Sequence, residues 1–197
     1  MDFLGYLTIA LFATWCVSEV VISLVSFRNR SRASAKGRDR LSFVVMWLSI
    51  MPPIWFALLV RLHKIFASGS GSFSTLSPLL GYLGCLFIVL GIAIRLVAVA
   101  TLKKQFTDRV SIVEKHEIVD TGIYRTVRHP AYLGNLASLL GLGLASGNWF
   151  SLSALVVLPI AATWYRIGVE ERALLGHFGL AYQEYASRTK RLLPRIY

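Results

Sequence analysis

Long apolar runs separated by short polar stretches set the hydropathy pattern of this chain. Five such runs occupy residues 3–27, 41–62, 78–102, 131–146 and 149–168. A helix that crosses a bilayer needs roughly 20 mostly apolar residues. The pattern therefore predicts an all-α, polytopic membrane protein with about five transmembrane helices in one membrane domain. The fourth run is short for a complete span, and the two-residue turn after it predicts an antiparallel hairpin with the fifth.

Basic residues orient these helices across the bilayer. Of the 21 Lys and Arg residues, 18 fall within residues 28–40, 103–128 and 166–195. These stretches alternate with the N-terminus, the Gly- and Ser-rich segment 67–77 and the turn at 147–148, which carry none. Because cytoplasmic loops are enriched in Lys and Arg, the N-terminus is expected outside and the C-terminus in the cytosol. The net charge of +11 then reflects topology, and no nucleic-acid partner is expected. Segment 67–77 is expected to be a flexible external loop.

Four chemically distinctive side chains interrupt the apolar runs. Cys16 and Cys85 lie in apolar surroundings without a CxxC pair or a neighbouring histidine, so neither a disulfide nor a metal site is expected. Glu19 and Arg95 are the ionisable residues deep within the predicted spans, at about the same depth from the cytosolic end. A lone charge at this depth costs about 3 kcal/mol or more. The two residues are therefore predicted to form an ion pair. Such a pair either fixes helix register or forms a polar wall of a cavity.

Candidate chemistry concentrates in two polar segments beside the membrane helices, 103–134 and 164–195. Pro130 suits the first turn of the fourth helix, which places Arg128 and His129 at a helix N-terminus that favours an anionic group such as a carboxylate. A short amphipathic helix is predicted from Glu170 to Tyr185, folded back as a lid over the cytosolic helix ends. An acid, a basic helix entrance and several tyrosines suit a zwitterionic ligand with an aromatic part. The alternative interpretation is that the arginines are topology signals and the tyrosines are interfacial anchors.

Two motifs in these segments resemble one membrane-enzyme family. The first is Gly122-x-Tyr124-x-x-x-Arg128-His129-Pro130-x-Tyr132-x-Gly134. The second is Glu170-Glu171-x-x-Leu174-x-x-x-Phe178-Gly179-x-x-Tyr182-x-x-Tyr185, followed by Arg191-x-x-Pro194. Together they are similar to the signature of the isoprenylcysteine carboxyl methyltransferase family and related integral membrane methyltransferases. The resemblance covers roughly residues 100–197.

The resemblance implies S-adenosyl-L-methionine as methyl donor, S-adenosyl-L-homocysteine as product, and a donor pocket facing the cytosol in the C-terminal half. It divides the chain into a three-helix membrane part, 1–102, and a cofactor-binding core, 103–197. It also implies an acceptor-orienting role for Arg166. The donor-binding residues it implies are His116, Glu117, Ile118, Val119, Tyr124, His129, Pro130, Ala131, Tyr132 and Glu170. In one departure, Arg109 stands where the eukaryotic enzymes have a donor-contacting glutamine.

Several functions remain open at this point. The acceptor is expected to be a lipid or lipid-linked molecule from the bilayer: an isoprenylcysteine, a phospholipid amine, a small thiol or a quinone-like lipid. A carboxylate acceptor needs no general base, so none is assigned. One alternative is an NADPH-dependent reductase of sterols or steroids with a similar C-terminal architecture. Another is a non-enzymatic membrane factor on the same scaffold.

Overall fold

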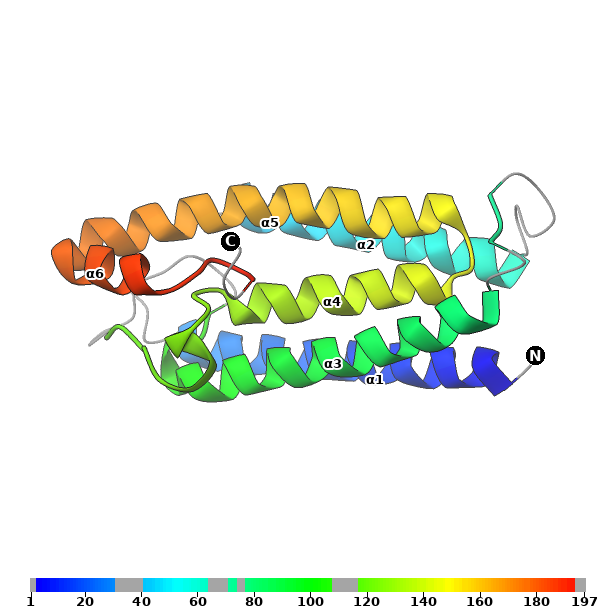
Figure 1. Ribbon diagram of the computed structural model, residues 1–197, viewed down its shortest axis with the longest axis horizontal. Coiled ribbons are helices and arrows are strands. Elements are labelled where there is room, and N and C mark those ends of the chain that lie inside the picture. The colour runs from blue at the N-terminus through cyan, green and yellow to red at the C-terminus, as the bar shows by residue number, and fades with distance from the viewer. Residues whose placement is uncertain (1–2, 31–40, 64–70, 74–76, 108–116, 194–197) are drawn as a thin grey trace.

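A computed structural model describes residues 3–30, 41–63, 71–73, 77–107 and 117–193. It consists of five long helices that run alternately up and down, followed by a short sixth helix that folds back beside the end of the fifth (Figure 1). The helices are α1 Phe3–Arg30, α2 Leu41–His63, α3 Ser77–Leu102, α4 Pro130–Ala145, α5 Trp149–Phe178 and α6 Leu180–Arg188. Two 3₁₀ turns, η1 Lys103–Gln105 and η2 Gly122–Arg125, lie between α3 and α4. The predicted all-helical class is confirmed.

The helices pack in an arc. α3 contacts both α1 and α4, α4 also contacts α5, and α5 contacts α2, so α1 and α2 stand at the two ends of the arc. Halfway along, Trp15 of α1 and Ile54 of α2 share one buried cluster with Ile88, Leu139 and Leu155 of the other three long helices. This cluster closes the middle of the bundle.

Four of the helices are long and apolar enough to cross a membrane: α1, α2, α3 and α5. The remaining predicted span, α4, is the fourth along the chain and has 16 residues. At 1.5 Å per residue it is about 24 Å long, less than the roughly 30 Å of a hydrocarbon core. Many apolar side chains on the outside of the bundle are exposed, among them Val17, Leu24, Trp47 and Trp55. A bilayer is the solvent such a surface needs, so the protein is an integral, multi-pass membrane protein.

α3 and α4 approach most closely, through small residues. A Cβ built on Gly91 would lie 2.5 Å from the Gly134 carbonyl oxygen, and one on Gly134 would lie 2.7 Å from the Arg95 backbone nitrogen. Gly84 and Gly141 repeat the arrangement two turns farther along, where each Cβ would meet the other's carbonyl oxygen at 2.6 and 2.5 Å. Close backbone approach of this kind drives helix association in membranes. It fixes the first turn of α4 beside the last third of α3.

The Glu19–Arg95 prediction is confirmed. Arg95 Nε lies 2.5 Å from Glu19 Oε1, and Arg95 Nη2 donates to Glu19 Oε2 at 2.8 Å. Arg95 Nη1 also donates to the Ala131 carbonyl oxygen at 3.0 Å. One guanidinium therefore joins α1, α3 and the start of α4.

One sequence prediction about local structure is wrong. Glu170 and Glu171 do not begin a separate helix, because α5 continues without interruption to Phe178. The chain then reverses at Gly179, whose φ of 56° favours glycine, and α6 is the part that folds back. Segment 67–77, predicted to be a flexible external loop, lies mostly outside the described residues. Its residues 71–73 pair with the α4–α5 turn, since Trp149 N donates to Gly71 O and Phe73 N donates to Gly147 O.

Candidate active site

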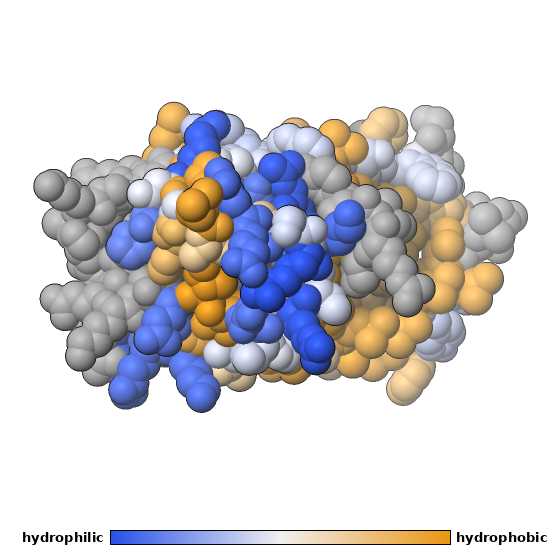
Figure 2. All heavy atoms as spheres, turned by 60° about the vertical axis from the view of Figure 1, so that its left-hand side comes forward, coloured by the Kyte–Doolittle hydropathy of each residue, from blue (hydrophilic) through white to orange (hydrophobic). Residues whose placement is uncertain are grey.

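A cavity of about 790 Å³ opens at the end of the bundle where α3 ends and α4 begins. Its membrane side is lined by apolar residues of α1 and α2, including Val20, Leu24, Met46, Trp47 and Ile50. Its other side is lined by polar and aromatic residues of η2, α4, α5 and α6. Figure 2 shows hydrophilic residues gathered at this end of the molecule, with hydrophobic surface farther along the bundle. One cavity therefore joins an apolar and a polar surface, and its lining comes from the N-terminal helices as well as from the C-terminal half.

The polar side is held together by pairing between two distant segments. Arg128 N donates to Lys190 O at 2.7 Å, His129 N to Arg191 O at 3.0 Å, and Lys190 N to Thr126 O at 3.0 Å. The chain after α6 thus lies parallel to the chain that enters α4, with Val127 opposite Lys190. This pairing fixes the backbone just before Pro130, which occupies the first turn of α4 as the sequence predicts.

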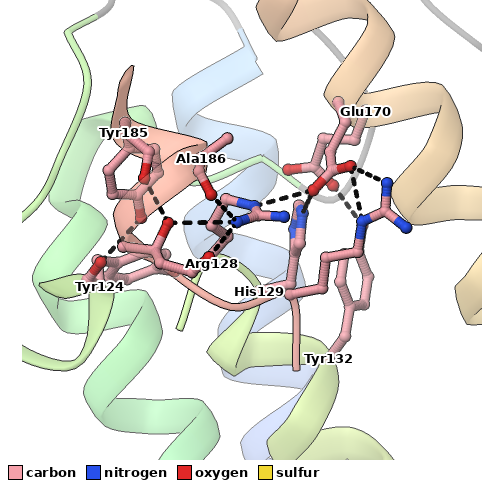
Figure 3. A network of polar contacts seen from close by, with 10 residues as sticks. Tyr124, Arg128, His129, Tyr132, Glu170, Tyr185 and Ala186 are labelled. Carbon is pink, nitrogen blue, oxygen red and sulfur yellow. Dashed lines mark hydrogen bonds and ion pairs between the residues drawn. The ribbon is translucent and has the colours of Figure 1, made fainter. Parts of the chain in front are cut away.

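The Arg128 side chain locks the same junction. Its Nη1 donates to the carbonyl oxygens of Ala186 and Thr189, and its Nε donates to Glu171 Oε1 at 2.9 Å (Figure 3). The sequence places Arg128 beside His129 as a basic group that favours an anionic ligand. In the structure its guanidinium is instead bound to protein acceptors. Arg128 therefore builds the pocket wall.

Glu171 is the acceptor on which three cationic or titratable side chains converge. Besides Arg128, it receives Arg191 Nε at 2.9 Å through Oε2, and His129 Nε2 lies 3.4 Å from Oε1. Sequence reasoning missed this role, although the residue stands next to Glu170 in the second motif. Adjacent residues of a helix point about 100° apart, so the two acids serve different neighbours.

Glu170 faces the cavity and belongs to a second network. Tyr132 Oη donates to Glu170 Oε2 at 2.9 Å and accepts from Arg166 Nε at 3.1 Å. Arg166 Nη1 donates in turn to Ser42 Oγ of α2 at 2.6 Å, and Arg166 is only 2% exposed. The network runs across the cavity floor from α5 through α4 to α2. It places a carboxylate, a phenol and a guanidinium on one wall.

Three buried tyrosines form the aromatic part of the site. Tyr185 Oη donates to the Tyr124 carbonyl oxygen at 2.9 Å, and the Tyr182 and Tyr185 rings lie 6.0 Å apart. Burial raises the pKa of Tyr185 to about 12, and it raises the pKa of Tyr124 further. These phenols therefore stay neutral at physiological pH and present rings and hydroxyl groups.

Most of the residues predicted from the sequence meet at this cavity. Those that line it are Glu117, Ile118, Val119, Tyr124, His129, Ala131, Tyr132, Arg166 and Glu170. Pro130 is buried behind the lining and shapes the helix start. His116 and Arg109 lie outside the described residues. Gln105 was not predicted; it lines the cavity, and its Oε1 accepts the Glu117 backbone N–H at 2.8 Å. No group of three or more His, Cys, Asp or Glu suited to a metal occurs in the described part of the chain.

Comparison with known proteins gives a consistent pattern. The model of the isoprenylcysteine carboxyl methyltransferase family matches residues 83–176. A probable protein-S-isoprenylcysteine O-methyltransferase of Oryza sativa subsp. indica is 33% identical over 117 residues, which cover 58% of this chain and 61% of that protein. The protein-S-isoprenylcysteine O-methyltransferase of Schizosaccharomyces pombe is 30% identical over 160 residues, covering 72% of this chain and 67% of that protein. The chain thus spans about three fifths of the plant relative.

The fold has a counterpart among solved structures. A structure of the eukaryotic intramembrane Ras methyltransferase ICMT aligns with a TM-score of 0.59 and 20% sequence identity. The alignment covers 96% of this chain and 68% of that chain. At this identity the likeness concerns the fold, and it extends over α1 and α2 as well as the motif-bearing half.

The two adjacent acids predict a clear difference in stability. We expect Glu171→Gln to lower the melting temperature by about 5 °C, because it removes the charge on which Arg128, His129 and Arg191 converge. Glu170→Gln keeps an oxygen that accepts from Tyr132 and is expected to change the melting temperature by less than about 2 °C. Thermal unfolding of the two purified variants measures this. Equal losses would contradict the separate roles assigned to the two acids.

Proposed function

The chain belongs to the isoprenylcysteine carboxyl methyltransferase family, and on this premise we propose that it is an S-adenosyl-L-methionine-dependent methyltransferase acting on a lipidic acceptor from the bilayer. The observation that carries the proposal is the single cavity with one polar, tyrosine-rich wall and one apolar wall open to lipid-facing helices. A polar donor and an apolar acceptor must occupy one cavity for the methyl group to be transferred.

The residues present fit the donor. A cavity of about 790 Å³ lies within the range typical of cofactor sites, about 300–1,000 Å³. Within the described residues no side chain caps the N-terminus of α4. Pro130 has no N–H and Tyr132 N donates to the His129 carbonyl oxygen, so we assign the Ala131 N–H to the donor's carboxylate. Glu170 is placed for the donor's ammonium group, and Tyr124 and Tyr182 offer aromatic surface for the adenine. We assign Glu117, Ile118 and Val119 to the adenosine side and His129, Ala131 and Tyr132 to the methionine side.

The methyl transfer requires little of the protein beyond the positioning of donor and acceptor. When bound, S-adenosyl-L-methionine supplies a methyl group made electrophilic by its sulfonium. The protein's task is to align the acceptor with that methyl group and to exclude water. Arg166, fixed by Tyr132 and Ser42, is assigned to orient an acceptor carboxylate, and no residue is assigned as a general base. The carboxylate oxygen forms the new bond to the methyl carbon while the sulfur keeps the electron pair of the broken bond, so no proton moves.

The reductase alternative fits less well. NADPH carries an additional phosphate that an exposed cluster of Arg or Lys would have to hold. In the part of the chain that the structure describes, the arginines that line the cavity are Arg95, Arg128 and Arg166. Each is already bonded to a carboxylate, carbonyl or hydroxyl group of the protein.

We also propose the orientation. The start of α1 and residues 71–73 lie at one end of the bundle, and the end of α3 and the start of α4 lie at the other (Figure 1). The cavity opens at this second end. The described basic residues within 103–107, 117–128 and 166–193 belong to the elements at the cavity end, so that end is assigned to the cytosol. Most of the basic stretch 28–40 lies outside the described residues.

A transfer assay tests the proposed function. Membranes containing the protein, supplied with donor labelled on its methyl group, are expected to yield labelled lipid-extractable product. Glu170→Gln is expected to weaken binding of S-adenosyl-L-homocysteine about tenfold, because the donor's ammonium loses its carboxylate partner. Label that never exceeds the level in membranes without the protein, across isoprenylcysteine and lipid-extract acceptors, would refute the proposal.

Arg166 is expected to act on turnover more than on donor binding. Arg166→Gln should lower kcat by at least about tenfold, while affinity for S-adenosyl-L-homocysteine changes less than about threefold. Arg188→Gln is the matched control, because Arg188 pairs with Asp120 on the exposed surface away from this cavity. Parallel losses of rate and donor affinity in Arg166→Gln would show that Arg166 belongs to the donor side.

Cysteine labelling tests the orientation. In a variant with Cys16 and Cys85 replaced by alanine, Ser72→Cys is expected to react with an impermeant maleimide from outside intact cells. Ser187→Cys, on the exposed face of α6, should react only after the membrane is opened. The reverse pattern would invert the topology.

A further inference from the structure

Three side chains with a charged or amide group line the membrane half of the cavity, where apolar residues are expected. They are Glu19 of α1, Arg95 of α3 and Asn135 of α4. None of the three belongs to the polar network around Glu170 and Glu171. Polar groups at membrane depth are costly and usually serve a function.

The Glu19–Arg95 pair lines the cavity and also contacts the packed interior. Arg95 and Glu19 side chains are 15% and 24% exposed, and both line the cavity beside apolar residues of α1 and α2. Arg95 donates from Nη1 to the Ala131 carbonyl oxygen and from Nη2 to Glu19, and its Nε is in ion-pair contact with Glu19 Oε1. A guanidinium has five N–H groups and a carboxylate has about four lone-pair positions, so both partners keep capacity for a ligand. The pair's net charge is zero, which favours a neutral dipolar group over an ion.

Asn135 lies beside this pair with its hydrogen-bonding capacity unused. It follows Ala131 by four residues, so it stands on the same face of α4 one turn, about 5.4 Å, deeper in the membrane. Asn135 is 4% exposed and lines the cavity, and its side chain makes no hydrogen bond to any residue that the structure describes. Because this amide lines the cavity without a protein partner among the described residues, a ligand with matching groups would be bound by it.

We propose that Asn135 and the Glu19–Arg95 pair form a subsite for an amide group of the acceptor, between its apolar chain and its reacting group. An asparagine amide offers both a donor and an acceptor, which another amide complements directly. The inference deepens the proposed function and rests on it. It makes these residues specificity-determining: they favour an amide-bearing amphiphile over one that is hydrocarbon up to the reacting group.

The position of the subsite agrees with this role. Arg95 bonds the carbonyl of Ala131, which adjoins Tyr132 of the assigned donor wall. On the other side, Val20, Leu24 and Trp47 line the cavity and are also exposed on the bundle surface, which gives an apolar chain a route to the lipid. An acceptor lying between these points would pass its middle section across Asn135.

Two probes that differ by one amide test the subsite. N-acetyl-S-farnesylcysteine and S-farnesyl-3-thiopropionic acid share the prenyl chain, the thioether and the carboxylate, and only the first carries an acetamido group. Binding of each to the full-length protein in nanodiscs is measured by displacement of a fluorescent prenyl ligand, and methyl transfer is measured separately. We expect the wild type to bind the acetamido probe about tenfold more tightly.

The variants remove the polar groups of the subsite without leaving an unpaired charge in the membrane. Asn135→Leu and the double variant Glu19→Leu/Arg95→Met are expected to reduce the preference to less than about threefold. Replacing both partners of a buried ion pair with apolar residues is often neutral for stability, so the double variant should fold. Thr14→Val is the matched control, because Thr14 is an exposed α1 residue that does not line the cavity. It should keep the wild-type preference.

The outcomes separate the subsite from the function. Equal binding of both probes by the wild type, or an unchanged preference in both cavity variants, would overturn the subsite. A purely structural ion pair would shift thermal stability and weaken both probes equally, which also overturns it. If the wild type shows the tenfold preference and methylates neither probe, the subsite stands and carboxyl methylation of prenylcysteine-type acceptors fails.

Discussion

The close contact between α3 and α4 is the constraint on which the rest of the structure depends. No Cβ fits at Gly91 or Gly134 without meeting the backbone of the other helix. Because the backbones touch there, the Arg95 guanidinium reaches both the first turn of α4 and Glu19 of α1. The start of α4 is thereby fixed relative to the membrane helices, and the polar wall of the cavity is built on that fixed start.

A second constraint comes from the chain after α6. Its pairing with residues 126–129 and the bonds of Arg128 to Glu171, Ala186 and Thr189 close the polar side around the entrance of α4. These contacts form without a sheet in the described part of the chain, and those of Arg128 join residues from 43 to 61 positions apart in the sequence. They leave the side chains of Glu170 and Tyr132 facing the cavity, in which we propose that a polar donor meets an apolar acceptor.

The sequence predicted the parts of this arrangement that follow from local pattern. Helix number and direction follow from apolar runs, and the Glu19–Arg95 pair follows from the cost of two lone charges at one depth. The different hydrogen-bond partners of Glu170 and Glu171 could not be predicted, because they depend on which side of α5 faces the chain after α6. The roles of Arg128 and Asn135 could not be predicted for the same reason. That of Arg128 depends on carbonyl groups distant in the sequence. That proposed for Asn135 depends on its lack of a hydrogen-bond partner within the described residues.

The central claim is that the cavity beneath α4 is a pocket for S-adenosyl-L-methionine. Calorimetric titration of the full-length protein with S-adenosyl-L-homocysteine, and in parallel with NADPH, tests it most directly. The account predicts saturable binding of one S-adenosyl-L-homocysteine per chain and no measurable binding of NADPH. Tight binding of NADPH without S-adenosyl-L-homocysteine binding would contradict it and would favour a reductase on the same scaffold.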